Sequence, residues 1–287
     1  MIYRNLKIGN TDLIKISKNI YAKCETQNPT GSVKDRIIAF ILKEAERNRE
    51  IVPGKTTLVE ATSGNTGIAL AAIGAHAGYK VRIIMPCNMS DERKKLIKTF
   101  GASLTLVSES NFAEAIEVRN SYCKSPDFWS PNQFENKLNI LCHKRYLAHE
   151  IGDQCRRLGI IWDAFVCGAG TGGTMMGVSS YLNNQKINFC KKVLMTPYEC
   201  NKTHGIQGVN DGADFLLERD EVDHIIKIKT SDAIERSKKF ASEFGMLVGI
   251  SSGANLLAAE EYVRKFQPNH AVVTLLCDRG ERYMSIY

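Results

Sequence analysis

The residues with the most specific chemistry lie in a glycine-rich segment after the apolar run Ala164–Cys167. The segment reads Gly168-Ala169-Gly170-Thr171-Gly172-Gly173-Thr174 and precedes a helical pattern. Glycines let backbone N–H groups approach an anion closely, and the start of the next helix adds the positive end of its dipole. The hydroxyls of Thr171 and Thr174 can donate as well. The segment is typical of a phosphate-binding loop, although a tight turn would also explain its glycines.

The same glycines fit the G-x-G-x-x-G pattern of a dinucleotide-binding loop. That motif expects an acidic residue about 20 residues further on, at the end of the next strand. Glu199 lies later than that. No Gly-Lys-Ser/Thr follows the glycines, which excludes a Walker loop. A nicotinamide-dinucleotide-binding protein therefore remains the alternative from another functional class.

A second candidate anion site precedes the alanine-rich pattern Thr66–Ala77. The segment Thr62-Ser63-Gly64-Asn65-Thr66 offers hydroxyls, an amide and free N–H groups at the start of that helix. Such an arrangement suits a carboxylate. The alternative is a capped helix, in which Thr62 or Ser63 satisfies the N–H groups of the first turn.

Lys34 is the candidate nucleophile. It lies in Asn28–Arg36, at the start of a helix whose apolar residues recur with a helical period. The helix dipole disfavours a positive charge there, which would lower the pKa of the amine and favour its nucleophilic form. A solvated surface lysine is the alternative.

These residues need a scaffold in which strands and helices alternate. Strand-like apolar runs occur at Thr57–Val59, Val81–Met85, Leu104–Val107, Ala164–Cys167, Val193–Met195 and Val272–Leu276. Helical patterns between or after them are Thr66–Ala77, Ser90–Thr99, Asp232–Glu243 and Ala254–Phe266. This alternation predicts an α/β fold with mostly parallel, helix-covered sheets. Ligands bind beyond the carboxyl ends of such strands, where the candidate loops lie.

Composition restricts the partners. The chain of 287 residues has a formal net charge of +7, but its basic residues are scattered among acidic ones. A nucleic-acid binder usually gathers them, so nucleic acid is not expected as a partner. The nine cysteines show no C-x-x-C pair or zinc-ligand spacing, so we expect no metal and a reducing compartment, the cytoplasm. We expect no membrane partner, because no apolar run approaches the ~20 residues of a membrane span.

Four motifs occur in a fixed order along the chain: N-P-x-G-S-x-K-D-R, T-S-G-N-T-G, G-x-G-T-G-G-T and G-I-S-S-G-A, the last in the presumed loop Gly249–Ala254. Together they resemble the cysteine synthase and cystathionine β-synthase family of fold-type II pyridoxal-phosphate enzymes. The resemblance implies a two-domain, tryptophan synthase β-like fold. Residues 35–137 would form a smaller domain with a mobile substrate-binding part, and 1–34 with 138–287 a larger cofactor domain. It also implies a homodimer.

The resemblance assigns roles to individual residues. Lys34 would form the internal aldimine with pyridoxal 5'-phosphate and move the α-proton. Asn65 would hold the pyridoxal hydroxyl oxygen, and Ser251 would face the ring nitrogen. The phosphate would lie on Gly170, Thr171, Gly172, Gly173 and Thr174. The carboxylate of a small amino-acid substrate would lie on Thr62, Ser63, Asn65 and Thr66, with Gln133 closing over it.

The implied reaction is replacement or elimination at the β-carbon of a cysteine- or serine-type amino acid. The cofactor supplies the electron sink. A neutral serine at the ring nitrogen would weaken that sink and favour rapid loss of a β-substituent, giving an α-aminoacrylate intermediate. Addition of sulfide after loss of acetate from O-acetylserine would then produce cysteine.

One departure from the family pattern bears on the nucleophile. Ile206-Gln207-Gly208 is followed by Asn210 and Asp211, where cysteine synthases typically carry a small Gly-Ala pair. A carboxylate in that pocket would repel hydrosulfide and could act as a general base on water. The alternative activity is thus cysteine degradation with release of hydrogen sulfide, yielding either serine or pyruvate and ammonia. In another interpretation Asp211 points away from the site.

Overall fold

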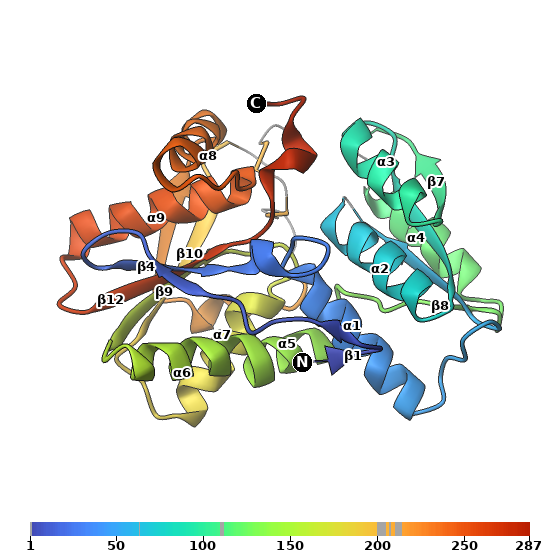
Figure 1. Cartoon of the computed structure of the whole chain (residues 1–287), viewed down its shortest axis with the longest axis horizontal. Helices are drawn as coiled ribbons and strands as arrows, with labels where there is room; N and C mark the ends of the chain where they lie inside the picture. The colour runs from blue at the N-terminus through green and yellow to red at the C-terminus, as the bar shows by residue number, and fades with distance from the viewer. Residues whose placement is uncertain (1, 63, 110–111, 200–204, 207, 210–213) are drawn as a thin grey trace.

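The computed structural model describes residues 2–62, 64–109, 112–199, 205–206, 208–209 and 214–287 (Figure 1). Ser63 and Asp211, which carry predicted roles, lie outside the described residues, as does Asn210. Within the described ranges, no helix is both long and apolar enough to span a bilayer.

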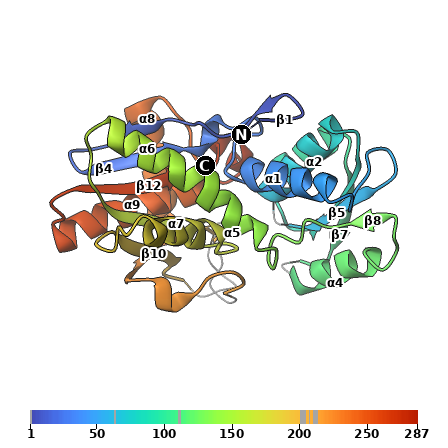
Figure 2. The ribbon, with the colours of Figure 1, turned by 90° about the horizontal axis from the view of Figure 1, so that it is seen from below.

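The smaller of two main sheets is fully parallel and has the strand order β7-β6-β5-β8. Its strands are β5 (Thr57–Ala61), β6 (Lys80–Pro86), β7 (Ser103–Val107) and β8 (Phe128–Trp129). Successive residues face opposite sides, so Leu58 and Val59 enter different apolar clusters. Helices α1 (Lys34–Arg47) and α2 (Asn65–His76) cover one face, and α4 (Phe112–Tyr122) covers the other (Figure 2). Helix α3 (Asp91–Thr99) packs beside α2.

The larger sheet has the order β11-β10-β9-β12-β4-β3 and is parallel except where β3 pairs with β4. Its strands are β3 (Leu13–Lys15), β4 (Ile20–Cys24), β9 (Trp162–Gly168), β10 (Lys191–Pro197), β11 (His224–Ile228) and β12 (Ala271–Leu276). One face packs on α6 (His149–Arg157) and α7 (Gly173–Asn184), the other on α9 (Ile250–Phe266). Helix α8 (Thr230–Phe244) packs on α9 (Figure 1).

Short elements complete the chain. Strands β1 (Ile2–Tyr3) and β2 (Leu6–Lys7) form an antiparallel pair. Helix α5 (Leu138–Cys142) runs directly into a π-helical turn, η2 (His143–Ala148). The 3-10 turns are η1 (Glu25–Gln27), η3 (Arg219–Glu221) and η4 (Gly280–Tyr283).

The predicted α/β class is confirmed, and each of the six strand-like runs lies in a strand. The four helical patterns lie in helices, except that Ala77 directly follows α2 and Ser90 directly precedes α3. The presumed loop Gly249–Ala254 is a wrong prediction, because α9 begins at Ile250 and includes Ser251. Gly253 does not break the helix. It lies so close to Ala233 and Ser237 of α8 that a β-carbon there would overlap them, and it therefore serves helix packing.

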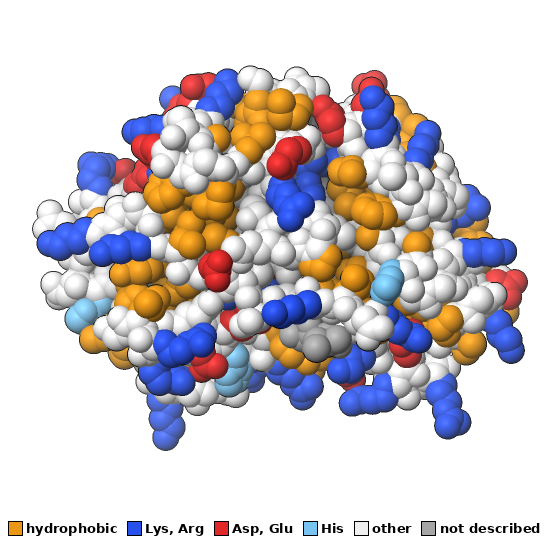
Figure 3. All heavy atoms as spheres, viewed as in Figure 1, with side chains coloured by type: hydrophobic (Ala, Val, Ile, Leu, Met, Phe, Trp, Pro, Cys, Tyr) orange, Lys and Arg blue, Asp and Glu red, His pale blue; other side chains and the backbone are white. Residues whose placement is uncertain are grey.

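The basic side chains are scattered over the surface, as they are along the sequence. On the face seen in Figure 3, lysine and arginine side chains are spread over the outline and interspersed with acidic ones.

Candidate active site

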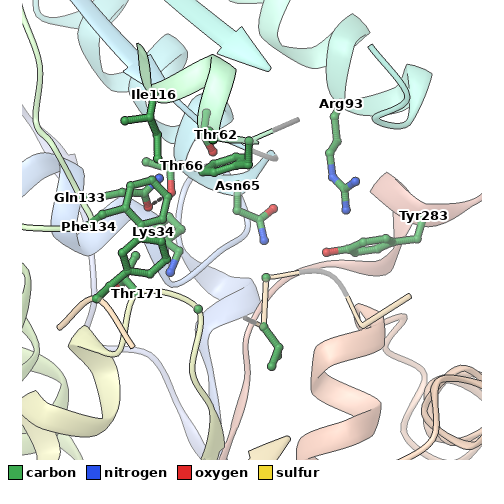
Figure 4. Close-up of a pocket in the computed structure, with 16 residues that line it drawn as sticks. Lys34, Thr62, Asn65, Thr66, Arg93, Ile116, Gln133, Phe134, Thr171 and Tyr283 are labelled. Atoms are coloured by element: carbon green, nitrogen blue, oxygen red, sulfur yellow. Dashed lines mark hydrogen bonds between the residues drawn. The ribbon is translucent and has the colours of Figure 1, made fainter. Parts of the chain in front are cut away.

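Most of the predicted site residues line a cavity of about 380 Å³ (Figure 4). Its lining includes Lys34, Thr62, Asn65, Thr66, Gln133, Gly170 and Thr171. A smaller adjoining cavity shares Lys34 and Asn65 with it and is lined further by Gly172, Thr174 and Ser251. The structure therefore brings together residues from five separate segments of the sequence. Gly173 begins α7 directly beside them.

Lys34 is the first residue of α1, as predicted, and its side chain points into the cavity between Asn65 and Thr171 (Figure 4). Burial lowers the pKa of its amine, and the nearby Cys277 and Asp278 only partly oppose that effect. Desolvation penalises the charged form of a lysine, so this site favours the neutral, nucleophilic amine.

The start of α2 provides the predicted carboxylate site. Thr62 and Thr66 are both buried, and Thr66 Oγ1 donates to Gln133 Oε1 at 2.6 Å. Gln133 Nε2 in turn donates to the Ala61 carbonyl at 3.4 Å. Thr62 Oγ1 accepts from the Gly64 N–H at 3.1 Å, but Gly64 precedes the first turn of α2, so Thr62 does not cap the helix and that alternative is wrong for this residue. The first turn of a helix leaves further N–H groups for an anion.

The amide of Asn65 is held by two charged residues near the C-terminus. Its Nδ2 donates to Asp278 Oδ2 at 2.6 Å, and its Oδ1 accepts from Arg282 Nη1 at 2.5 Å. Arg282 also donates to the Thr30 carbonyl at 2.6 Å, which fixes the guanidinium. Because an amide nitrogen has two hydrogens, Asn65 keeps one for a ligand oxygen.

The glycines of the predicted phosphate loop are required by space and conformation. Gly172 has a φ of +86°, and a β-carbon there would overlap the backbone of Leu217. A β-carbon on Gly170 would overlap the Gly208 carbonyl. The loop thus forms a cradle at the start of α7 that only small residues allow.

Ser251 lies in the first turn of α9 and is 6% exposed. It borders the smaller cavity together with Cys277, whose pKa burial raises to about 12. Ser251 is a neutral residue, and the pKa of Cys277 keeps that thiol uncharged too. A glycine cradle, a buried amine, an amide and a neutral hydroxyl around one cavity fit the pyridoxal phosphate that the resemblance implies.

Sequence reasoning assigned no role to several lining residues. Phe112, Phe134 and Phe215 form an apolar wall, with ring centroids 5.4 Å apart for the first pair and 4.5 Å for the second. Opposite them, the buried guanidinium of Arg93 lies 4.6 Å from the ring centroid of Tyr283 (Figure 4). These contacts join distant segments of the sequence.

Comparison with known proteins identifies the family. Residues 5–278 match the family described as "Pyridoxal-phosphate dependent enzyme". A cysteine synthase of Staphylococcus aureus is 38% identical, covering 97% of this chain and 94% of that protein. Cysteine synthase B of Campylobacter jejuni is 40% identical, covering 97% and 95%. A crystal structure of a hydrogen sulfide-producing enzyme from Fusobacterium nucleatum matches with a TM-score of 0.89 and 34% identity, covering 96% of this chain and 97% of that one.

These similarities confirm the predicted cofactor and the predicted class of enzyme. They fit β-replacement or β-elimination on an amino-acid substrate and support the cysteine synthase-like prediction. Cysteine degradation is compatible with them but is not favoured over synthesis. The alternative of a nicotinamide-binding protein loses its basis, because the glycine loop lies in a matched pyridoxal-phosphate enzyme. The chain belongs to the family of pyridoxal-phosphate-dependent enzymes.

Proposed function

We propose that the chain synthesises cysteine by replacing the acetate of O-acetylserine with sulfide. The observation that carries the proposal is the cavity that joins the buried Lys34 amine to the start of α2. Two relatives, at 38% and 40% identity, are cysteine synthases, which supports the same activity.

The charges around the cavity support an anionic substrate and nucleophile. Among the described lining residues, Arg93 carries a cationic side chain, the buried amine of Lys34 is neutral, and none carries a carboxylate. A confined positive field attracts small anions such as an amino-acid carboxylate or hydrosulfide. The volume of about 380 Å³ suits a small molecule.

Pyridoxal phosphate, when bound, supplies an electron sink for the α-carbon of the substrate. The residues of the chain orient the substrate and move its proton. Thr66, held by Gln133, would bind the substrate carboxylate together with the N–H groups of α2. The neutral amine of Lys34 would take the α-proton, and the aromatic wall that includes Phe134 would limit access of water.

A second candidate activity is suggested by one specific similarity, that to the hydrogen sulfide-producing enzyme of Fusobacterium nucleatum. In this alternative, Asp211 accepts a proton from water, which replaces the thiol of L-cysteine and yields L-serine and hydrogen sulfide. Without addition of water at the β-carbon, the products would be pyruvate, ammonia and hydrogen sulfide.

A product assay on the purified, yellow holoenzyme tests both activities. We expect cysteine and acetate from O-acetylserine with sulfide, at a kcat/KM well above that of any reaction of L-cysteine alone. Serine with sulfide from L-cysteine, and no cysteine synthesis, would instead establish water as the nucleophile. Pyruvate as the main product would mean plain elimination.

Replacing Asp211 with asparagine tests the role of its carboxylate. If Asp211 activates water, the substitution should lower serine formation from L-cysteine by at least about 100-fold, since a positioned general base contributes about 10²–10⁴-fold. The matched control is Asp214→Asn, because Asp214 pairs with Arg219 at 2.8 Å on the surface. Serine formation that persists in the Asp211 variant would assign the residue no catalytic role.

Three further properties are part of the proposal. Two separate main sheets support a division into residues 35–137 and the remainder. The described cysteines are all free, which supports a reducing compartment, the cytoplasm. We also propose a homodimer, for which light scattering coupled to size-exclusion chromatography would give the mass.

A further inference from the structure

We propose that Asn139 and His143 are positioning residues that turn both threonines of the phosphate loop into hydrogen-bond donors. The inference rests on the cofactor site described above and concerns residues that contact the phosphate loop rather than the cofactor itself. Asn139 lies in α5 and His143 begins η2, one helical turn later, so both can face α7. Both side chains are buried.

Asn139 donates to the first threonine. Its Nδ2 lies 3.0 Å from Thr171 Oγ1 and also 3.0 Å from the Gln133 carbonyl oxygen. A carbonyl oxygen can only accept, so the amide nitrogen must face Gln133 and its second hydrogen is directed to Thr171. Thr171 Oγ1 accepts a further hydrogen bond from the Gly173 N–H at 3.3 Å. With two donors on its oxygen, the Thr171 hydroxyl proton is free for another acceptor.

His143 contacts the second threonine, Thr174, through a ring nitrogen. Its Nε2 lies 3.2 Å from Thr174 Oγ1. The approach depends on Gly177 of α7, where a β-carbon would lie 2.5 Å from the His143 β-carbon. The other ring nitrogen, Nδ1, is buried without a hydrogen-bond partner in the described part of the chain.

The surroundings of His143 determine its protonation. Burial is the largest of the effects that hold the pKa of the imidazole well below its usual value, so the ring is neutral. A neutral ring carries one proton. Buried N–H groups without a partner are rarer than buried acceptors without one, so the proton belongs on Nε2 rather than on the unpartnered Nδ1.

The consequence concerns the direction of the Thr174 hydroxyl. When Nε2–H donates to Oγ1, the hydroxyl proton can point into the smaller cavity that Thr174 borders. In the opposite tautomer, Nε2 would accept a hydrogen bond from the Thr174 hydroxyl, and the threonine would present only lone pairs to a phosphate that can only accept. The hydrogen bonds from Asn139 and His143 thus leave the hydroxyl protons of both loop threonines available to donate to a phosphate dianion.

Nitrogen NMR on the wild-type holoenzyme tests the tautomer directly. The chain has six histidines, and the signal missing from His143→Leu identifies His143. We expect a neutral ring with the proton on Nε2. A proton on Nδ1, or an imidazolium, would overturn the proposal even if every variant failed to fold.

Cofactor affinity tests the consequence. His143→Leu should raise the dissociation constant of pyridoxal phosphate at least about ten-fold, the order expected for one hydrogen bond to a charged group. His143→Gln, whose side-chain amide can still donate, should retain most of the affinity. In a Thr174→Val background, His143→Leu should cause no further loss, because the two residues act through one contact.

Two results would contradict this expectation: unchanged affinity in His143→Leu, or an equal loss in His143→Gln. Melting temperatures of the apo-proteins separate both from general unfolding. The readouts concern cofactor binding, so a holoenzyme that made no cysteine would refute the proposed function and leave this inference testable.

Discussion

Replacing Lys34 with alanine should lower kcat/KM at least about a thousand-fold, because the loss of general acid–base catalysis alone costs about 10²–10⁴-fold and the nucleophile is lost with it. Lys34 supplies the only amine among the described residues that line the two adjoining cavities. Its pKa is lowered by burial, so the neutral form needed for catalysis extends to a lower pH than for an exposed lysine. Steady-state rates and the absorbance of the purified protein measure the effect.

Two variants accompany this experiment. Lys34→Arg keeps the charge but cannot supply a neutral amine, so it should be as inactive as the alanine variant. Lys18→Ala removes an exposed lysine and should behave like the wild type. Appreciable turnover by Lys34→Arg would show that the residue contributes charge rather than nucleophilicity.

The position of Lys34 illustrates what the sequence could predict. The helical period of the residues that follow it and the strand-like runs are local patterns, and local patterns located the elements and their loops. The loop Gly168–Thr174 was predictable for the same reason. Its glycines serve a requirement of the loop itself, as the φ of Gly172 demonstrates.

Features that depend on contacts between distant segments were not predictable. The Arg93–Tyr283 contact and the Phe112–Phe134–Phe215 wall join elements from opposite parts of the chain. The loop predicted around Gly253 was wrong, because a glycine in a loop and a glycine that lets two helices pack closely look alike in one sequence. The role of Asn139 could not be predicted, because its hydrogen-bond partners Gln133 and Thr171 come close to it only in the folded chain.

The second large effect concerns the buried ion pairs that anchor α1 two residues after Lys34. Arg36 is fully buried, and its Nε lies 2.6 Å from Glu25 Oε2 while its Nη2 lies 2.8 Å from Glu150 Oε2. Burial alone would lower the pKa of Arg36, but these two carboxylates raise it above its usual value. Glu25 follows β4 and Glu150 belongs to α6, so the arginine ties the start of α1 to the larger sheet.

Replacing Arg36 with methionine should therefore lower the free energy of unfolding by about 3–5 kcal/mol, because it leaves the fully buried carboxylate of Glu25 without its charged partner. Urea denaturation measures the change. Arg156→Ala, which removes an exposed pair with Asp153, should cost less than about 1 kcal/mol. If the two substitutions cost the same, the buried pairs contribute no more than a surface pair.

Acid titration provides an independent measurement of the same interaction. Burial alone would raise the pKa of Glu150, but its hydrogen bonds and charge interaction with Arg36 outweigh burial and lower it to about 2. A carboxylate with a lowered pKa in the folded state stabilises the fold above its unfolded pKa, and this stabilisation is lost as the pH falls toward the folded value. The wild type should thus lose this contribution between about pH 4.5 and pH 2. In Arg36→Met the pKa of Glu150 should rise, so the loss should already occur at a higher pH. An unchanged acid profile would mean that Lys23, 3.0 Å from Glu150, rather than Arg36 holds that carboxylate in its charged form.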